Sequence, residues 1–79
     1  MNNLEIYNSV FVETLMVEVK DLVGLKYQDV NAWDSVGHMQ LMAALEERFG
    51  IEMDIDDIID FSSYEKGKET LGKYSIQIE

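Results

Sequence analysis

Apolar residues recur at helical spacing along two long segments of the chain. From residue 4 to about residue 15 they recur at i, i+1, i+4 and i+5, which gives one apolar stripe, and Asn2 or Asn3 can cap this segment. The second periodic segment runs from residue 35 to about residue 49 and stops at Gly50, a residue type favoured just after helix ends. The pattern therefore predicts two main helices.

Weaker helical patterns follow the second segment. Asp54–Asp60 suits a short third helix with acids in its first turn. Ser62 and Glu65 have the spacing of a capping box, which predicts a fourth helix from about residue 63 to residue 74. We expect the tail after it to pack back onto the core. The apolar residues expected to reach the core around the third helix are Ile51, Met53, Ile55, Ile58 and Ile59.

The connection between the two main helices is long and irregular. A short helical turn is expected at 19–22, and Gly24 ends it. Leu25, Tyr27 and Val30 alternate loosely with polar residues, as in a loop that a few side chains fix to a core. Loops of this length in compact domains are uncommon and often functional.

Composition narrows the class of protein. With 79 residues, we expect one domain covering 1–79, too small for a deep catalytic cleft. The sequence has no cysteine, so any thiol chemistry needs a cofactor. No basic N-terminal segment suggests a signal peptide, and no apolar run approaches the ~20 residues that span a bilayer. We expect a cytoplasmic monomer without membrane insertion and without a metal site.

The net charge of −10 is concentrated in the middle of the chain. Residues 34–60 hold eight acids and one arginine, which gives −7, whereas residues 61–79 are neutral. Such a surface repels nucleic acid and attracts basic protein partners.

The second predicted helix has two apolar faces. Leu41, Met42, Leu45 and Phe49 share one face with His38, and this face should meet the core. The other face is smaller and is flanked by acids. It either packs under a loop or forms a transient interface, which typically has an apolar centre and a charged rim. The residues of this smaller face are Val36, Met39 and Ala43, with Glu46 and Glu47 beside them.

Asp34 and Ser35 stand where the second helix begins. Both are favoured N-cap types, and most such pairs act only as caps. A helix N-terminus also favours negative charge, so a phosphate on Ser35 would be stabilised there.

Asp34-Ser35-Val36, followed by the helical run over 37–51, resembles the acyl carrier protein family. That family has Asp-Ser-Leu at the start of its second helix, a Leu-rich helix that ends in Leu-Glu-Glu-x-Phe, and a serine that carries 4′-phosphopantetheine. Val36 replaces the usual leucine and keeps an apolar group there. Trp33-Asp34 replaces the usual small residues, which suggests a specialised branch rather than the housekeeping fatty-acid carrier.

The resemblance implies an all-α, small four-helix acyl-carrier-type bundle with a long loop between helices one and two and a short third helix. It implies a non-catalytic carrier. A phosphopantetheinyl transferase would move 4′-phosphopantetheine from coenzyme A onto Ser35, and Asp34 would help to present this serine. The arm's thiol would hold acyl or aminoacyl groups as thioesters for partner enzymes of fatty acid, polyketide or related biosynthesis.

Two groups of residues surround this expected site. The docking face for basic patches of acyl-loading and acyl-processing enzymes would comprise Val36, Met39, Ala43, Glu46, Glu47, Asp56 and Asp57. The core or a sheltered chain pocket would be lined by Leu41, Met42, Leu45, Phe49, Ile58 and Phe61.

Three other interpretations fit parts of the sequence. An unmodified acidic adaptor for a basic partner is the main alternative. A hydrolase using Ser35 and His38 lacks the strand-turn-helix nucleophile elbow. The acids from Asp54 to Glu65 partly match a calcium loop, but Ile58 and Ile59 stand where the loop needs an oxygen ligand and a glycine.

Overall fold

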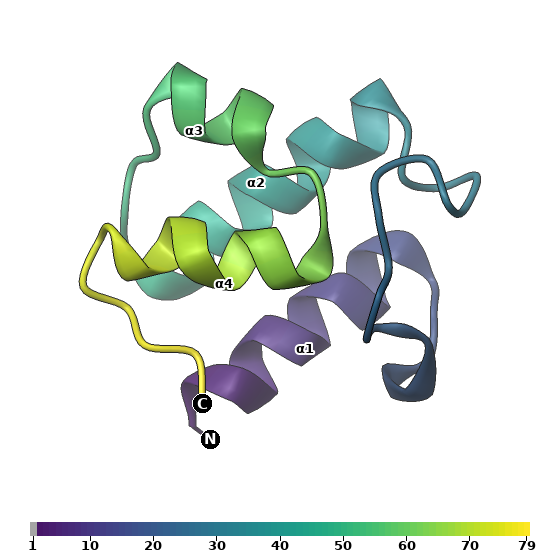
Figure 1. The fold of residues 1–79 in the computed structure, drawn as a ribbon, viewed down its shortest axis with the longest axis horizontal. Helices are drawn as coiled ribbons and strands as arrows, with labels where there is room; N and C mark the ends of the chain where they lie inside the picture. The colour runs from purple at the N-terminus through teal and green to yellow at the C-terminus, as the bar shows by residue number, and fades with distance from the viewer. Residues whose placement is uncertain (1) are drawn as a thin grey trace.

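Four α-helices form the protein in a computed structural model that describes residues 2–79. They are α1 (Asn3–Leu15), α2 (Ser35–Phe49), α3 (Ile55–Asp60) and α4 (Tyr64–Gly72), and a 3-10 helix, η1 (Val19–Asp21), follows α1 (Figure 1). Within the described residues there is no strand, only an isolated antiparallel bridge. The all-α prediction with a short third helix is confirmed.

The helices surround one aromatic core. In Figure 1, α1 lies below, α4 crosses in front of α2, and α3 lies above. The start of α1 and the tail after α4 lie close together, and Asn3 Nδ2 donates to the carbonyl oxygen of Gln77 at 3.0 Å. Phe11 lies at the centre, with its ring centroid 5.6 Å from Trp33 and 4.9 Å from Tyr7. The other buried apolar residues are Val10, Leu15, Leu22, Leu25, Leu41, Met42, Leu45, Met53, Phe61, Tyr64 and Leu71.

Local sequence explains where the main helices begin and end. Asn2 Oδ1 accepts the N–H of Glu5 at 2.8 Å at the start of α1. Gly50 ends α2 with φ of +66°, a left-handed conformation that glycine adopts without strain. The predicted cap and stop residues are therefore confirmed.

The connection between α1 and α2 is tied down along its length. Leu25 is buried, its carbonyl accepts the N–H of Tyr64 at 2.9 Å, and the N–H of Tyr27 donates to Ser62 at 2.9 Å. These bonds attach the loop to the start of α4. The buried Leu25 side chain agrees with the prediction, whereas Tyr27 is 36 % exposed and is held through its backbone N–H.

The start of α4 differs from the prediction. Ser63, not Ser62, caps the helix by accepting the N–H of Lys66 at 2.9 Å. Glu65 does not reach back to the cap but accepts the N–H of Gly24 at 2.7 Å. The capping box is wrong because the carbonyl of Ser62 is already paired with the loop, which places the cap one residue later. The helix also ends at Gly72, before the predicted residue 74.

The isoleucines of α3 divide between two faces. Ile58 is half-buried against the core, but Ile55 and Ile59 are 73 % and 70 % exposed. The prediction that these two reach the core is wrong, because a helix of six residues turns only one narrow face inward.

Candidate functional site

The first turn of α2 is fixed by Asp34. Its Oδ1 accepts the N–H of Gly37 at 2.8 Å, and its carbonyl accepts the N–H of His38 at 2.7 Å. Ser35 is the first residue of the helix and is exposed. Among residues 2–79, nothing accepts a hydrogen bond from the backbone N–H of Ser35 or Val36. These two donors and the helix dipole suit a phosphate on Ser35.

Gly37 allows this turn to sit directly on the preceding loop. A Cβ built on Gly37 would lie 1.7 Å from the carbonyl oxygen of Ala32. Only glycine fits such a close approach. The sequence offers a weak sign of it, a glycine inside a helical pattern where alanine would be about 1 kcal/mol more favourable.

Trp33 and His38 form a second contact between loop and helix. Trp33 is fully buried, and its Nε1–H donates to His38 Nδ1 at 3.0 Å. The other ring nitrogen, Nε2, lies 2.7 Å from the carbonyl oxygen of Ile58 in α3. His38 thus lies on the inner side of α2, as predicted. Sequence reasoning missed the burial of Trp33.

An apolar pocket of about 320 Å³ opens beside Ser35. It lies between the first half of α2 and the end of α3, and Tyr27 comes from the loop to close one side. His38 and Ile58 line it together, so the hydrogen bond between them joins its walls. Its other lining residues are Met39, Ile59, Phe61 and Ser62.

The smaller apolar face of α2 is open. Val36 is 65 % and Met39 is 56 % exposed, and Ala43 is exposed beside them. Ile55 and Ile59 of α3 add further exposed apolar side chains. The sequence pattern predicts these two isoleucines in the core and therefore does not reveal them as surface residues.

The acids expected around this face differ in their surroundings. Glu47 and Asp56 are exposed. Glu46 is half-buried, and its Oε2 accepts the N–H of Met53 at 2.8 Å. Glu46 therefore also holds the connection between α2 and α3.

Asp57 faces the end of α4. Its side chain is only 13 % exposed and accepts hydrogen bonds from Tyr74 Oη at 2.6 Å and from Lys73 Nζ at 3.0 Å. These bonds, first that of Tyr74 and then that of Lys73, hold the pKa of Asp57 below its ordinary value. Asp57 links α3 to α4.

The geometry does not support Ser35 and His38 as a nucleophile and base. Both ring nitrogens of His38 are engaged by Trp33 and Ile58, so neither is available to the Ser35 hydroxyl. Residues 2–79 contain no cluster of three or more side chains that could hold a metal ion. No helix in the same residues is long and apolar enough to cross a bilayer.

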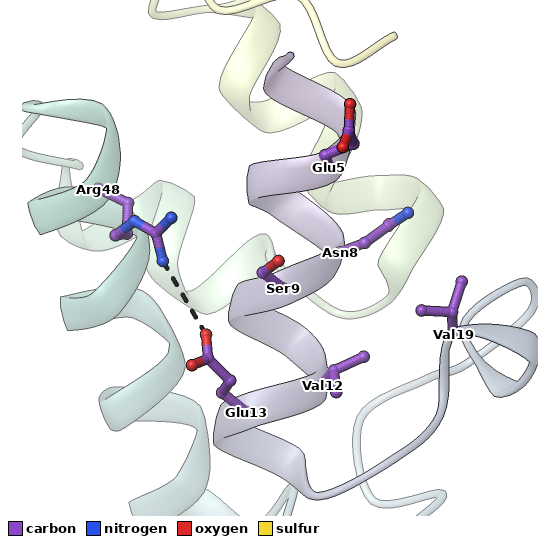
Figure 2. A pocket seen from close by; sticks show the side chains of 7 residues that line it. All are labelled: Glu5, Asn8, Ser9, Val12, Glu13, Val19 and Arg48. Atoms are coloured by element: carbon purple, nitrogen blue, oxygen red, sulfur yellow. Dashed lines mark ion pairs between the residues drawn. The ribbon is translucent and has the colours of Figure 1, made fainter. Parts of the chain in front are cut away.

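A second hollow, of about 640 Å³, lies elsewhere (Figure 2). It follows the outer side of α1, between Val19 of η1 and Arg48 at the end of α2. Glu13 and Arg48 approach to 4.0 Å across one side, and such exposed ion pairs contribute little to stability. The hollow shares no lining residue with the pocket beside Ser35.

Residues 33–66 match a family model described as the phosphopantetheine attachment site. The matched segment begins at Trp33, contains all of α2 and α3, and ends in the first turn of α4. No curated protein and no solved structure matches the chain. The match supports an acyl carrier protein-type family, as the sequence predicts, and proteins of this family carry covalently attached 4′-phosphopantetheine.

Proposed function

We propose, from the premise that this is an acyl carrier protein-type chain, that Ser35 is the attachment point of 4′-phosphopantetheine. The observation that carries the proposal is the position of this exposed serine at the start of α2, inside the matched segment and beside an apolar pocket. The family match supports a phosphopantetheine-carrying protein, and such carrier domains are generally non-catalytic.

The attachment step uses the hydroxyl of Ser35. Its Oγ gives its proton to a base on the transferase and forms a bond to the phosphorus that bears the pantetheine arm of coenzyme A. The bond from this phosphorus to the departing 3′,5′-adenosine bisphosphate breaks. Asp34 and Gly37 hold the helix start in place, so Oγ is presented at a fixed position.

The product is a phosphodiester at a helix N-terminus. The N–H groups of Ser35 and Val36 point in the direction that favours its negative charge. The attached group supplies a thiol that holds acyl or aminoacyl cargo as a thioester. Tethering keeps this cargo at high effective concentration near each partner enzyme.

The docking face proposed for partner enzymes has an apolar centre of Val36, Met39 and Ala43. Ile55 and Ile59 extend this centre onto α3. Glu47 and Asp56 provide an exposed acidic rim for basic patches of the transferase and of acyl-loading enzymes. Glu46 and Asp57 contribute charge but also have partners within the chain.

The family match supports assigning the carrier to fatty acid, polyketide or related biosynthesis, in which the arm would hold an acyl or aminoacyl thioester. The apolar lining of the pocket beside Ser35 suits an acyl chain better than an aminoacyl group, whose charged amine would lose its water there.

Intact mass spectrometry tests the proposal. The chain is incubated with coenzyme A and a promiscuous phosphopantetheinyl transferase, and we expect the mass gain of one arm. Ser35→Ala should abolish the gain, whereas Ser62→Ala, which alters an exposed serine of the same pocket, should keep it. Circular dichroism confirms that both variants stay helical. A folded native chain that no transferase modifies would leave the acidic adaptor as the function.

A further inference from the structure

We propose that the hollow of about 640 Å³ along the outer side of α1, here called the α1 groove, is a second docking surface. Its occupant is a basic amphipathic helix of a partner protein, which binds there while Ser35 stays accessible. The groove shares no residue with the docking face on α2 and α3, and binding in it does not require an arm on Ser35.

Exposed large apolar side chains gather in two parts of the chain. One group surrounds the pocket beside Ser35 and extends the docking face. The other group is Met16, Val19 and Val23, each largely exposed and all within residues 16–23. Val19 lines the α1 groove, and Met16 follows Val12, another lining residue, by four positions. Single exposed apolar residues need no explanation, whereas several beside a groove mark an interaction site.

The α1 groove has an apolar centre and a charged rim. Val12 points from α1 toward Val19 of η1, so the two side chains face one another across the groove (Figure 2). Glu5 and Glu13 are exposed and line the groove on either side of Val12 along the helix. This is the usual arrangement of a transient protein interface. A lipid chain would leave both carboxylates unpaired, so the arrangement favours a protein as the occupant.

The charges of the α1 groove favour a basic partner. The carboxylates of Glu5 and Glu13 line it with only one guanidinium, that of Arg48, and the whole chain has a net charge of −10. Glu13 and Arg48 are 4.0 Å apart and both exposed, so a cation of the partner can replace Arg48 at Glu13 at little cost. The negative field also speeds the encounter with a basic partner.

The length of the α1 groove fits a helix. Glu5 and Glu13 are eight residues apart on α1, which corresponds to about 12 Å at 1.5 Å per residue. A helix lying along α1 meets both carboxylates with basic residues seven or eight positions apart and packs apolar residues against Val12 and Val19. An extended strand fits less well, because the backbone groups of α1 are bonded within the helix and offer it no partners.

The α1 groove lies away from the site of attachment. In Figure 1, α1 forms the lower side of the molecule and α3 the upper side. Arg48 is 13 residues after Ser35 on α2, which places the two about 20 Å apart along the helix. One partner can therefore hold the chain at the α1 groove while another acts at Ser35, and the tethered pair gains in effective concentration.

A peptide titration of the unmodified full chain tests the proposal. The probe is a synthetic peptide of about 18 residues, above the length at which isolated helices are marginal, with leucines on one face and two arginines seven positions apart beside them. Amide chemical shifts of the ¹⁵N-labelled chain should change most at residues 5–19 and at Arg48. A peptide with glutamates in place of the two arginines should bind on the order of tenfold more weakly.

Matched variants separate the α1 groove from general charge attraction. Val19→Lys puts a cation into the apolar centre and should weaken binding on the order of tenfold, whereas Met39→Lys on the docking face should not. Glu13→Gln should weaken binding about threefold, as expected for one exposed ion pair. Glu52→Gln removes the same charge at an exposed residue outside both surfaces and should leave the affinity unchanged.

Three results overturn the proposal. The first is that shifts fall on the docking face instead of the α1 groove, or that Val19→Lys and Met39→Lys weaken binding equally. The second is a dimer that forms without peptide and is lost in Val19→Lys, because a second copy of the chain then occupies the groove. The third is that bound peptide stops modification of Ser35. If Ser35 accepts no arm even without peptide, the proposed function fails, while the titration still tests the groove.

Discussion

Replacing Gly37 by alanine tests most directly how the first turn of α2, which carries Ser35, is positioned against the preceding loop. The added Cβ would lie 1.7 Å from the Ala32 oxygen and 2.9 Å from its carbon, and both atoms belong to the backbone. Because Cβ contacts under 3.0 Å essentially never occur, the oxygen must retreat by at least 1.3 Å, the difference between these distances. The loop that carries buried Trp33 must move with it.

Two terms of opposite sign set the size of the effect. Alanine is favoured over glycine within a helix by about 1 kcal/mol. Forcing extra volume into a packed site costs about 1–3 kcal/mol, and the upper part of this range, about 2–3 kcal/mol, applies here because a backbone neighbour cannot rotate away. We expect the free energy of unfolding of Gly37→Ala to fall by about 1–2 kcal/mol and the Tm to fall by roughly 5–15 °C. Ser35 should also be modified more slowly, because its position depends on the shifted turn.

Urea and thermal unfolding, followed by circular dichroism, measure this change. Gly72→Ala is the matched control, because its Cβ would meet nothing within 4 Å and its φ is not in the left-handed region. It should be neutral or stabilising by up to about 1 kcal/mol. If Gly37→Ala is as stable as Gly72→Ala, the turn does not rest on the Ala32 carbonyl and our account of how Ser35 is positioned is wrong.

Two further predictions concern α3 and the docking face. Because hydrogen bonds lower the pKa of Asp57 in the folded protein, its stabilising contribution is complete above the unfolded value of about 4 and is lost as the pH falls through the lowered value. Stability curves of the native chain and Asp57→Asn should therefore converge between about pH 5 and about pH 2, with exposed Asp56→Asn as control, and a constant difference would refute this. Met39→Glu should lower kcat/KM for the transferase by on the order of tenfold without changing the Tm. Val23→Glu, an equally polar change at an exposed residue of the loop, should leave the rate unchanged, and equal losses in both variants would argue against a docking face at Met39.

The sequence predicts α2 well because every local signal agrees there. Asp34 caps the helix, the apolar positions keep one period, and Gly50 ends it in a left-handed conformation. The directions of its two faces also follow from 100° steps. Leu41 and Leu45 are buried, while Val36 and Met39 are exposed.

The contacts of the loop before α2 could not be predicted from the sequence. It has no periodicity, so nothing along the chain shows that Trp33 is fully buried or that its indole binds His38. The partner of Glu65 is Gly24, which lies 41 residues away. A contact between residues so far apart in the sequence forms only in the folded protein, whereas a capping box involves residues three positions apart and can be recognised from the sequence.

The error at α3 has a related cause. Six residues make fewer than two turns, so Ile55, Ile58 and Ile59 fit the core equally well by spacing. Their directions are set by what holds the helix: the Ile58 carbonyl bound by His38 and the Asp57 carboxylate bound by Tyr74. These contacts turn Ile55 and Ile59 to the surface.

The two helices beside the pocket are therefore held by different kinds of contact. The start of α2 rests on a backbone approach at Gly37 and on a fully buried indole, contacts that tolerate little displacement. α3 is held by a few hydrogen bonds, each worth only about 1 kcal/mol, so it can open locally while the core stays folded. A carrier needs both properties. In the proposed function, the transferase must meet Ser35 in one geometry, while the pocket wall formed by α3 must adjust to the cargo on the arm.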